Sequence, residues 1–343
     1  SYATTPTMST MLEMPGISKT YGAVRANRDI DLTVQRGEIV GLLGENGSGK
    51  STLMKILFGM VRPDTGGIVY QGRELAAGSP KGALDAGIAM IHQHFTLVEA
   101  MTVTDNLMLG MHGGCAWLAP AAMAQRIRDA GERYGLTIDP DARVESLALG
   151  EKQRVEILKA MLRGADLLIL DEPTSILSPP EIAQLLDFLK RFRAEGRSVI
   201  FITHKLGEVL EVADQVVVLR DGQVVGAQST QGATRESLAR LMVGRDPAPA
   251  AARVDTPPGR ERLRVEGLSA RDASGVQRLK DVSFTLRAGE VLAIAGIDGN
   301  GQGELADTLA GMTRASGGAV FLDGVDITPG SPRTRVAAGI ACL

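Results

Sequence analysis

One short stretch near the N-terminus constrains the fold of this chain more than any other feature. Residues 44–51 read Gly-Glu-Asn-Gly-Ser-Gly-Lys-Ser, which is the pattern G-x-x-x-x-G-K-S. The stretch follows Ile39–Leu43, an apolar run predicted to be a buried strand, and precedes Ser51–Phe58, which has helical spacing. In that context the glycines let backbone N–H groups wrap around phosphates, and the helix start adds a positive dipole end.

The residues of this loop have separate expected roles. Lys50 is expected to hold the β- and γ-phosphates of a nucleotide, and the Ser51 hydroxyl is expected to ligate Mg²⁺. The alternative is a glycine-rich turn with a surface lysine, which the flanking strand and helix disfavour. The predicted phosphate-binding residues are Gly44, Glu45, Asn46, Gly47, Ser48, Gly49, Lys50, Ser51 and Thr52.

Two acidic residues follow a second apolar run. Leu167–Leu170 is predicted to be a buried strand, and Asp171 and Glu172 come directly after it. Asp171 is expected to hold Mg²⁺ directly or through water, and Glu172 is expected to accept a proton from an attacking water molecule. Such a pair on its own is more often a solvated strand end. Together with the phosphate loop, it predicts a site for nucleotide hydrolysis.

An internal repeat organises the chain. Residues 36–44 read RGEIVGLLG and residues 288–296 read AGEVLAIAG, an offset of 252 residues. Leu343 is the equivalent of Ile91, so we expect one complete unit followed by the opening part of a second, without its helical and catalytic parts. Residues 246–261, DPAPAAARVDTPPGRE, are rich in Pro and Ala and are predicted to be a linker.

The spacing of apolar residues predicts an α/β fold with a largely parallel sheet, because short apolar runs alternate with segments of helical spacing. The interval from about 94 to 150 is mostly helical and is predicted to be an inserted subdomain. The predicted domains are a flexible leader at 1–11, a first unit at 12–245, the linker at 246–261 and part of a second unit at 262–343. Besides Ile39–Leu43, Leu167–Leu170 and Ser51–Phe58, the predicted strands are Val199–Thr203 and Gln215–Leu219, and the predicted helices are Met123–Tyr134, Gln153–Leu162 and Glu181–Phe192.

Composition argues against several classes of function. The chain has 343 residues, a net charge of −3 and two cysteines, Cys115 and Cys342. This charge predicts no general attraction to nucleic acid, and two distant cysteines cannot supply a metal cluster or a disulfide framework. No run of 18 apolar residues occurs, so no membrane-spanning helix is predicted.

Further residues, together with these motifs, make the chain resemble the ABC ATPase family from about Leu12 onward. Gln93, in MIHQHF, resembles the Q-loop glutamine, which senses Mg²⁺ and couples to a membrane partner. His204 resembles the switch histidine that contacts the γ-phosphate, and Tyr21 resembles the aromatic residue that stacks on adenine. The segment that resembles the LSGGQ signature consists of Leu147, Ala148, Leu149, Gly150 and Glu151.

The resemblance implies a fold and two cofactors. Members of the family have a P-loop NTPase fold, with a RecA-like parallel core, an antiparallel β subdomain and an inserted helical subdomain. Here a partial second copy would follow. The implied cofactors are ATP and Mg²⁺. In the family two units pair head to tail, so that each ATP lies between the phosphate loop of one unit and the signature segment of the other.

The sequence departs from the family pattern at one of these two sites. In the first signature segment Ala148 lacks a hydroxyl, and the Leu149 side chain could crowd a backbone approach. The family usually has Asp where Ser178 stands. In the second phosphate loop, Gln302 replaces the lysine and Gly303 replaces the Mg²⁺-binding serine. We therefore expect the full-length protein to have one hydrolytic site and one degenerate site.

The layout indicates a branch of the family. Lys50 and Leu147 are 97 residues apart, which leaves room for a short helical insertion and none for a long coiled coil. The short linker and the degenerate second loop resemble the layout of the fused double ATPase in bacterial importers of simple sugars and nucleosides. The stretch IHQHF, residues 91–95, favours the nucleoside type. The resemblance implies transmembrane permease subunits as partners, a solute-binding protein acting indirectly, and a peripheral location on the cytoplasmic face of the inner membrane.

Two alternatives remain open at this point. One is a non-transport ABC ATPase acting on nucleic acid or ribosomes, which would bind RNA or DNA in a salt-dependent way. The net charge of −3 and the short linker argue against it, and no nucleic acid is expected as a partner. The other is a regulatory nucleotide-binding module without turnover, which Glu172 and His204 argue against. The transported solute cannot be read from an ATPase subunit.

Overall fold

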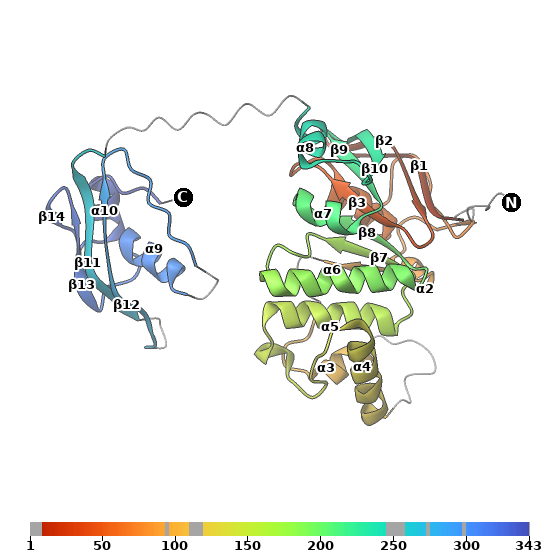
Figure 1. Ribbon diagram of the computed structural model, residues 1–343, viewed down its shortest axis with the longest axis horizontal. Helices are drawn as coiled ribbons and strands as arrows, with labels where there is room; N and C mark the ends of the chain where they lie inside the picture. The colour runs from red at the N-terminus through yellow and green to blue at the C-terminus, as the bar shows by residue number, and fades with distance from the viewer. Residues whose placement is uncertain are drawn as a thin grey trace. The chain divides into compact units, whose positions relative to one another are not determined.

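The computed structural model describes residues 9–92, 96–109, 119–244, 258–271, 275–296 and 300–342. The chain divides into two units, Ser1–Ala248 and Pro249–Leu343, and each is described here by itself (Figure 1).

A six-stranded sheet with the order β10-β9-β3-β8-β7-β6 forms the centre of the first unit. β3 pairs in parallel with β8 on one side and β9 on the other, whereas β10 is antiparallel to β9. Both faces of a parallel sheet are covered, which explains why β3 and β8 are buried along their whole length. The strands are β3 (Ile39–Leu43), β6 (Ile88–Ile91), β7 (Leu167–Asp171), β8 (Ser198–Ile202), β9 (Gln215–Arg220) and β10 (Gln223–Ser229).

A second, antiparallel sheet of the first unit has the order β2-β1-β4-β5. Its strands are β1 (Thr10–Tyr21), β2 (Val24–Gln35), β4 (Val69–Tyr70) and β5 (Arg73–Glu74). β1 begins inside the segment predicted to be a leader, and Met11 is buried in the core at 1% exposure. This sheet is the antiparallel subdomain that the family resemblance implied, and together the two sheets confirm the predicted α/β class.

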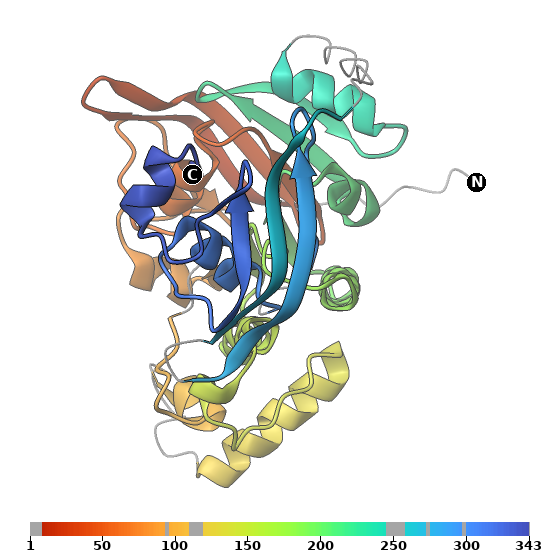
Figure 2. The ribbon, with the colours of Figure 1, turned by 90° about the vertical axis from the view of Figure 1, so that its left-hand side faces the viewer.

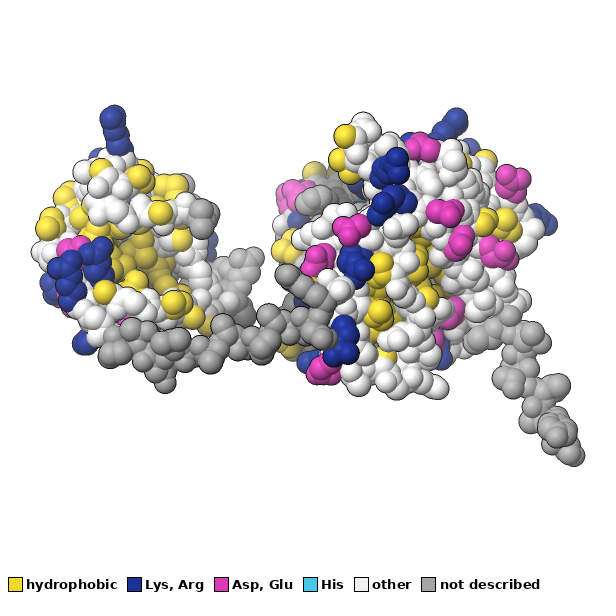
Figure 3. Space-filling view, turned by 90° about the horizontal axis from the view of Figure 1, so that it is seen from above, with side chains coloured by type: hydrophobic (Ala, Val, Ile, Leu, Met, Phe, Trp, Pro, Cys, Tyr) yellow, Lys and Arg dark blue, Asp and Glu magenta, His cyan; other side chains and the backbone are white. Residues whose placement is uncertain are grey.

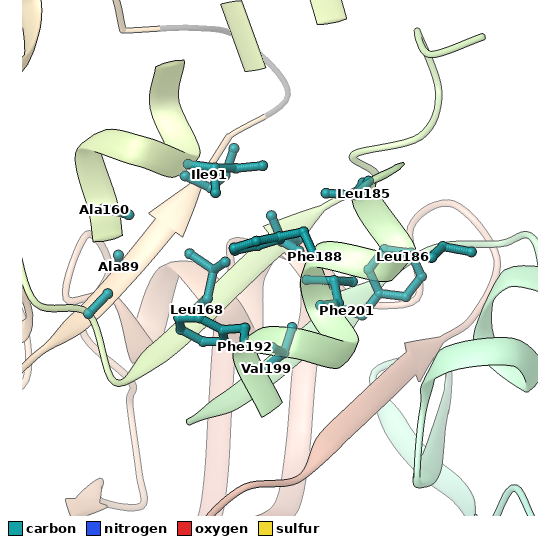
Figure 4. Close-up of a cluster of buried hydrophobic side chains, with 14 of the residues drawn as sticks. Ala89, Ile91, Ala160, Leu168, Leu185, Leu186, Phe188, Phe192, Val199 and Phe201 are labelled. Atoms are coloured by element: carbon teal, nitrogen blue, oxygen red, sulfur yellow. The ribbon is translucent and has the colours of Figure 1, made fainter. Parts of the chain in front are cut away.

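Helices pack on the parallel sheet through aliphatic and phenylalanine side chains. Phe188 and Phe192 of α6 contact the sheet beside Leu168 of β7 and Phe201 of β8, as Figure 4 shows. All four side chains are buried, so three phenylalanine rings pack among aliphatic side chains at this interface. The helices of the core are α1 (Lys50–Leu57), α2 (Pro80–Asp85), α6 (Pro179–Ala194), α7 (Leu206–Val212) and α8 (Arg235–Val243).

The interval predicted to be a helical insertion contains α3 (Val103–Met108), α4 (Pro120–Tyr134) and the short 3₁₀ helix at Val144–Ser146. These helices lie at the end of the first unit away from β1 and β2 (Figures 1 and 2). α5 (Leu149–Leu162) follows and begins four residues before the predicted Gln153, because Glu151 accepts a hydrogen bond from the Ala148 N–H at 2.9 Å and caps the helix. No helix of the described ranges is long and apolar enough to span a bilayer.

The second unit contains an antiparallel sheet with the order β12-β11-β13-β14. A small core that includes Val265, Leu268 and Leu305 joins this sheet to α9. Hydrophobic side chains also gather on an exposed face of this unit (Figure 3), and Val291 is 90% exposed. The elements are β11 (Glu261–Arg271), β12 (Gln277–Arg287), α9 (Gln302–Ala310), β13 (Gly317–Leu322), β14 (Val325–Asp326) and α10 (Pro332–Ala337).

Candidate functional site

The predicted phosphate loop connects the end of β3 to the start of α1. Its glycines have backbone conformations that other residues rarely adopt, with φ of +154° at Gly44, +82° at Gly47 and +102° at Gly49. A side chain at Gly44 would collide with the carbonyl oxygen of Leu219, so the loop lies directly against the end of β9. The first residue of α1 is Lys50, which leaves the unpaired N–H groups of the helix start beside the loop.

Lys50 is held inside the loop that it belongs to. Its Nζ donates hydrogen bonds to the carbonyl oxygens of Gly44 at 2.7 Å and Glu45 at 2.9 Å. Burial lowers the pKa of the ammonium group, and the nearby charges of Glu172 and Asp171 oppose this shift. A third, longer contact joins Nζ to Ser48 Oγ at 3.4 Å, and a buried cation beside a glycine-rich loop is suited to exchanging such contacts for phosphate oxygens.

The acidic residue predicted to hold Mg²⁺ lies against the predicted serine ligand. Ser51 Oγ is 3.2 Å from Asp171 Oδ2, with the serine at the start of α1 and the aspartate at the end of β7. Burial raises the pKa of Asp171, the hydrogen bond from Ser51 lowers it, and the charge of Glu172 raises it further.

The donor set at this place fits magnesium. Mg²⁺ prefers oxygen ligands, and in nucleotide sites the protein supplies only one or two while phosphates and waters supply the rest. The Ser51 and Asp171 oxygens match this pattern, and the described residues contain no cluster of three or more acidic, His or Cys side chains that could hold a metal ion.

Glu172 occupies a strained position next to His204. Its backbone φ is +47°, a left-handed value that a non-glycine residue adopts at a cost, and its N–H donates to the Ile202 carbonyl at 3.0 Å. The bond to β8 brings the glutamate close to the residue that follows this strand by two positions. As a result, Glu172 Oε1 and His204 Nδ1 are 3.2 Å apart, and the structure brings the two predicted catalytic side chains together.

A cleft with a volume of about 780 Å³ is bordered by Lys50, Ser51, Asp171 and Glu172. Tyr21, at the end of β1, is 48% exposed, so one face of its ring is open to a flat ligand. His204 does not line the cleft itself and reaches it through Glu172. The lining residues are Tyr21, Val24, Arg25, Ala26, Asn46, Gly47, Ser48, Gly49, Lys50, Ser51, Thr52, Asp171, Glu172 and Asp221.

Gln93 lies outside the described residues, which resume at Thr96. Thr96 is held by a buried acid of α5, because Glu156 Oε1 accepts from both its N–H and its Oγ1 at 2.8 Å. His92 and Thr96 both line a groove of about 190 Å³. The groove is therefore bordered by residues on either side of the predicted Q-loop glutamine.

The predicted signature segment lies at the start of α5 and is not part of the cleft lining. Leu149 is 45% exposed, and Ala148 presents its N–H to Glu151. A side chain at Gly150 would meet the carboxylate of Glu181, so the start of α5 lies directly against that of α6. Leu147 packs partly against the core.

The helix that follows the second phosphate loop starts in the same way as the helix that follows the first. α9 begins at Gln302, after Gly301 with φ of +93°, just as α1 begins at Lys50 after Gly49. Ile297, Asp298 and Gly299 lie outside the described residues. The start of the helix is therefore repeated, whereas the lysine and the serine are replaced by Gln302 and Gly303.

Sequence reasoning missed polar residues around the loops. Asn27 of β2 donates to the Gly49 carbonyl, and Gln153 of α5 donates to the carbonyl of Pro173, next to Glu172, at 2.9 Å. Glu156 was missed as well. The sequence signal for both residues was a polar residue at a position where an apolar one is expected. Glu156 stands between the apolar residues Val155 and Ile157, and the repeat has Leu279 at the position equivalent to Asn27.

Comparison with known families now decides the relationship. The profile of the family described as "ABC transporter" matches residues 27–175 and 279–343. The two matched stretches begin 252 residues apart, which is the offset of the repeat. The chain belongs to the ABC transporter family.

Curated relatives of this ABC protein are similar along almost all of its length. The glucose import ATP-binding protein of Haloferax volcanii is 46% identical over 98% of this chain and 66% of its own length. The guanosine import ATP-binding protein of Bacillus subtilis is 41% identical over 97% of this chain and 66% of its own length. The chain thus spans slightly less than two thirds of the relatives that it matches.

Solved structures agree on the fold. A nucleotide-free ATP-binding cassette from an ABC transporter is 22% identical, with a TM-score of 0.60 over 68% of this chain and 95% of that chain. An ATP-binding subunit of an ABC transporter is 30% identical, with a TM-score of 0.58 over 68% of this chain and 99% of that one. The family cassette fold that the motifs predicted is therefore confirmed.

Proposed function

We propose that this protein is the ATP-binding and ATP-hydrolysing subunit of an importer for a simple sugar or a nucleoside. The observation that carries the proposal is the meeting of Lys50, Ser51, Asp171 and Glu172 at one cleft, with His204 in contact with Glu172. The relatives reported above carry importer names for both solute classes. They give no support to an ATPase that acts on nucleic acid.

ATP is proposed to bind along the cleft from Tyr21 to Asp171. The adenine ring would stack on Tyr21, and the phosphates would lie against the N–H groups of the loop at 44–52. Lys50 would then give its hydrogen bonds to the β- and γ-phosphates instead of to its own loop carbonyls. Ser51 and Asp171 would hold Mg²⁺, which neutralises phosphate charge when it is bound.

Hydrolysis is assigned to the pair at the end of β7 and β8. Glu172 would orient the attacking water and take its proton, because Glu172 lines the cleft beside Asp171. His204 would position Glu172 through the 3.2 Å contact and reach the γ-phosphate. Gln93 is proposed to sense the metal and report on the nucleotide.

A transmembrane permease is the proposed partner, and a solute-binding protein would act indirectly through it. The groove that His92 and Thr96 line is the proposed contact surface, because its lining combines apolar side chains with Lys159 and Arg163. ATP binding and hydrolysis would then move the permease between two states from the cytoplasmic face of the inner membrane. The groove is lined by Phe58, Leu84, Gly87, Ile88, Ala89, Met90, Ile91, His92, Thr96, Glu156, Lys159, Ala160, Arg163 and Ala165.

The two sites of the full-length protein are proposed to differ. The intact loop of the first unit needs a signature segment from another unit, since its own segment at 147–151 does not line the cleft. The altered loop around Gln302 would meet the altered segment with Ala148 and Leu149. One site would hydrolyse ATP, and the other would serve a structural or regulatory purpose.

The experiment that tests this proposal measures Mg²⁺-dependent ATP binding and turnover by this chain beside Glu172→Gln. We expect tight binding by both proteins and negligible turnover, because the site lacks a partner signature segment. Appreciable turnover that Glu172→Gln abolishes would keep the ATPase assignment and overturn the asymmetric pairing, since the segment at 147–151 would then serve in trans. Absence of Mg²⁺-dependent ATP binding would overturn the proposed function.

A further inference from the structure

Asn27, in β2, is a buried polar residue that none of the proposed roles uses. Its side chain is only 1% exposed, and its Nδ2 donates to the carbonyl oxygen of Gly49 at 3.1 Å. Because a carbonyl oxygen can only accept, the amide nitrogen is the end of the side chain that faces the loop. Within the described ranges, Asn27 Oδ1 is a buried acceptor without a hydrogen-bond partner.

An unpartnered amide oxygen in the core lowers stability, so the position calls for an explanation other than folding. The repeat supplies a direct comparison. The second unit has Leu279 at the equivalent place, 252 residues later, buried to 4% exposure. Its Cδ2 would lie 3.2 Å from a side chain placed at Gly301, the counterpart of Gly49. The fold of the repeat therefore accepts an apolar residue here.

The carbonyl that Asn27 holds belongs to the last residue before Lys50. The same oxygen accepts the N–H of Leu53 at 2.9 Å, which is the first hydrogen bond of α1. The peptide group between Gly49 and Lys50 therefore sets where α1 begins and in which direction the Lys50 side chain leaves the backbone. Fixing this one carbonyl fixes both parts of the phosphate site.

The backbone around Gly49 confirms how closely the loop rests on β2. A side chain at Gly49 would collide with the carbonyl oxygen of Ala26 and would lie 2.6 Å from Asn27 Nδ2. On another side, Gly222 N donates to the Ser48 carbonyl at 3.2 Å. The loop therefore rests on β2 at Ala26 and on the turn after β9 at Gly222, and the Asn27 side chain holds its Gly49 carbonyl.

We propose that Asn27 is a positioning residue that holds the phosphate loop in its binding geometry through the Gly49 carbonyl, and that the first unit keeps this amide at a cost in stability. The inference rests on the proposed function, since it concerns ATP binding by the same loop. It also adds a third difference between the units, because the second unit lacks the amide as well as the lysine and the serine.

The test is titration of this chain with fluorescent mant-ATP and Mg²⁺, with thermal unfolding of each variant measured in parallel. Asn27→Leu copies the second unit, Asn27→Ala removes the amide without adding volume, and Leu279→Asn is the matched control. We expect Asn27→Leu and Asn27→Ala to lower the affinity about tenfold, the value of one lost hydrogen bond to a positioned group. Asn27→Leu should keep or raise the unfolding temperature, and Leu279→Asn should leave the affinity unchanged.

Competition with tripolyphosphate assigns the effect to the loop, because this probe has no base. We expect its affinity to fall by the same factor as that of mant-ATP. Wild-type chain that fails to bind nucleotide would overturn the proposed function and this inference with it. Wild-type binding with both Asn27 variants within twofold of it would overturn the inference alone. The inference is also overturned if affinity falls only in step with the unfolding temperature, if tripolyphosphate is unaffected, or if Leu279→Asn changes the affinity equally.

Discussion

Ile39–Leu43 of the first unit and Val291–Ala295 of the second are equivalent segments with opposite surroundings. In the first unit the segment is β3, fully buried between β8 and β9. In the second unit the same pattern has no strand assigned, and Val291 is 90% exposed whereas Ile39 is 0% exposed. Within the described residues of the second unit, no strand pairs with this segment. A strand of a parallel sheet is thus defined by its neighbours as much as by its own residues.

The antiparallel part of the two units shows the converse. β11 and β12 repeat the pairing of β1 and β2, and β13 pairs with β11 much as β4 pairs with β1. β1 with β2 and β11 with β12 are hairpins of adjacent strands, whereas Leu12 pairs with Tyr70 and Leu263 with Leu322, 58 and 59 residues apart. Ile39 of the parallel sheet pairs with Val199, 160 residues away, so that sheet depends on strands from more distant parts of the chain.

The largest difference between the units should come from the loop lysine. Lys50→Gln copies the residue at 302 and removes a cation that lies between the loop and the phosphates. We expect the affinity for Mg²⁺·ATP to fall about 1,000-fold, because charge-assisted hydrogen bonds to two phosphates are lost. Isothermal titration calorimetry measures this. A loss below tenfold would mean that the loop backbone carries the site and that Gln302 does not explain the degeneracy of the second unit.

A buried arginine is a polar residue that the second unit has and the first unit lacks. Arg335 is 2% exposed and donates to the carbonyl oxygens of Thr308, Leu309 and Thr328 at 2.8 to 2.9 Å, where the first unit has Ala83. Arg335→Ala removes three hydrogen bonds from a charged donor, although Thr308 O keeps the Gly311 N–H, and should destabilise the second unit by about 3 kcal/mol. Hydrogen exchange resolved by segment would show this loss.

The control for that variant lies within the same molecule. Amides of β3 and β8 should exchange at the same rate as in the wild type, because the first unit has no part in the arginine contacts. Equal loss of protection in both units would show that their stabilities are coupled and that the comparison cannot treat them separately.

The glycine before each helix should reveal how tightly each loop is held. Gly49→Ala forces a side chain against the Ala26 carbonyl, while at Gly301 the equivalent carbonyl, that of Arg278, would be 2.9 Å away. Gly47 has φ of +82° and open space around it, so Gly47→Ala carries only the backbone cost of about 1–2 kcal/mol. We expect thermal unfolding to rank the losses as Gly49→Ala, then Gly301→Ala, then Gly47→Ala. A different order would mean that the loops relax freely.

Motifs and periodicity predicted most of the site, because the chemistry of phosphate binding requires particular residues at fixed spacing. The four predicted strands of the parallel sheet are present, and Lys50, Ser51, Asp171 and Glu172 meet as expected from the strand ends. The importer branch also agreed with the names of relatives. The preference for nucleosides over sugars stays a prediction, because the names of the relatives include both solute classes.

What the sequence could not reveal depends on contacts between distant segments. The start of α5 was missed because its cap, Glu151, only becomes visible as a hydrogen bond to Ala148. Asn27 was missed because nothing local places it next to Gly49, 22 residues away.

The smallest expected effect is a pH dependence that the second loop should lack. Burial raises the pKa of Asp171 above its usual 3.8 and lowers that of Lys50 below its usual 10.5. In the free protein, therefore, folding favours the protonated carboxyl, and its stabilising contribution is lost as the pH rises through the raised pKa. Binding of Mg²⁺ needs the ionised carboxylate, so affinity for Mg²⁺·ATP should fall as the pH drops towards that pKa, by at most about tenfold per pH unit.

Affinity should likewise fall at alkaline pH, as Lys50 loses its proton. Calorimetry over a pH series, in two buffers with different heats of ionisation, counts the protons released on binding. The γ-phosphate itself titrates at about pH 6. The contribution of Asp171 is therefore the difference in the number of protons released on binding between the wild type and Asp171→Asn. If both proteins have the same acid limb, Asp171 does not bind the metal in its ionised form. The replacement of Ser51 by Gly303 in the second unit would then change the shape of the loop and not its binding of a metal.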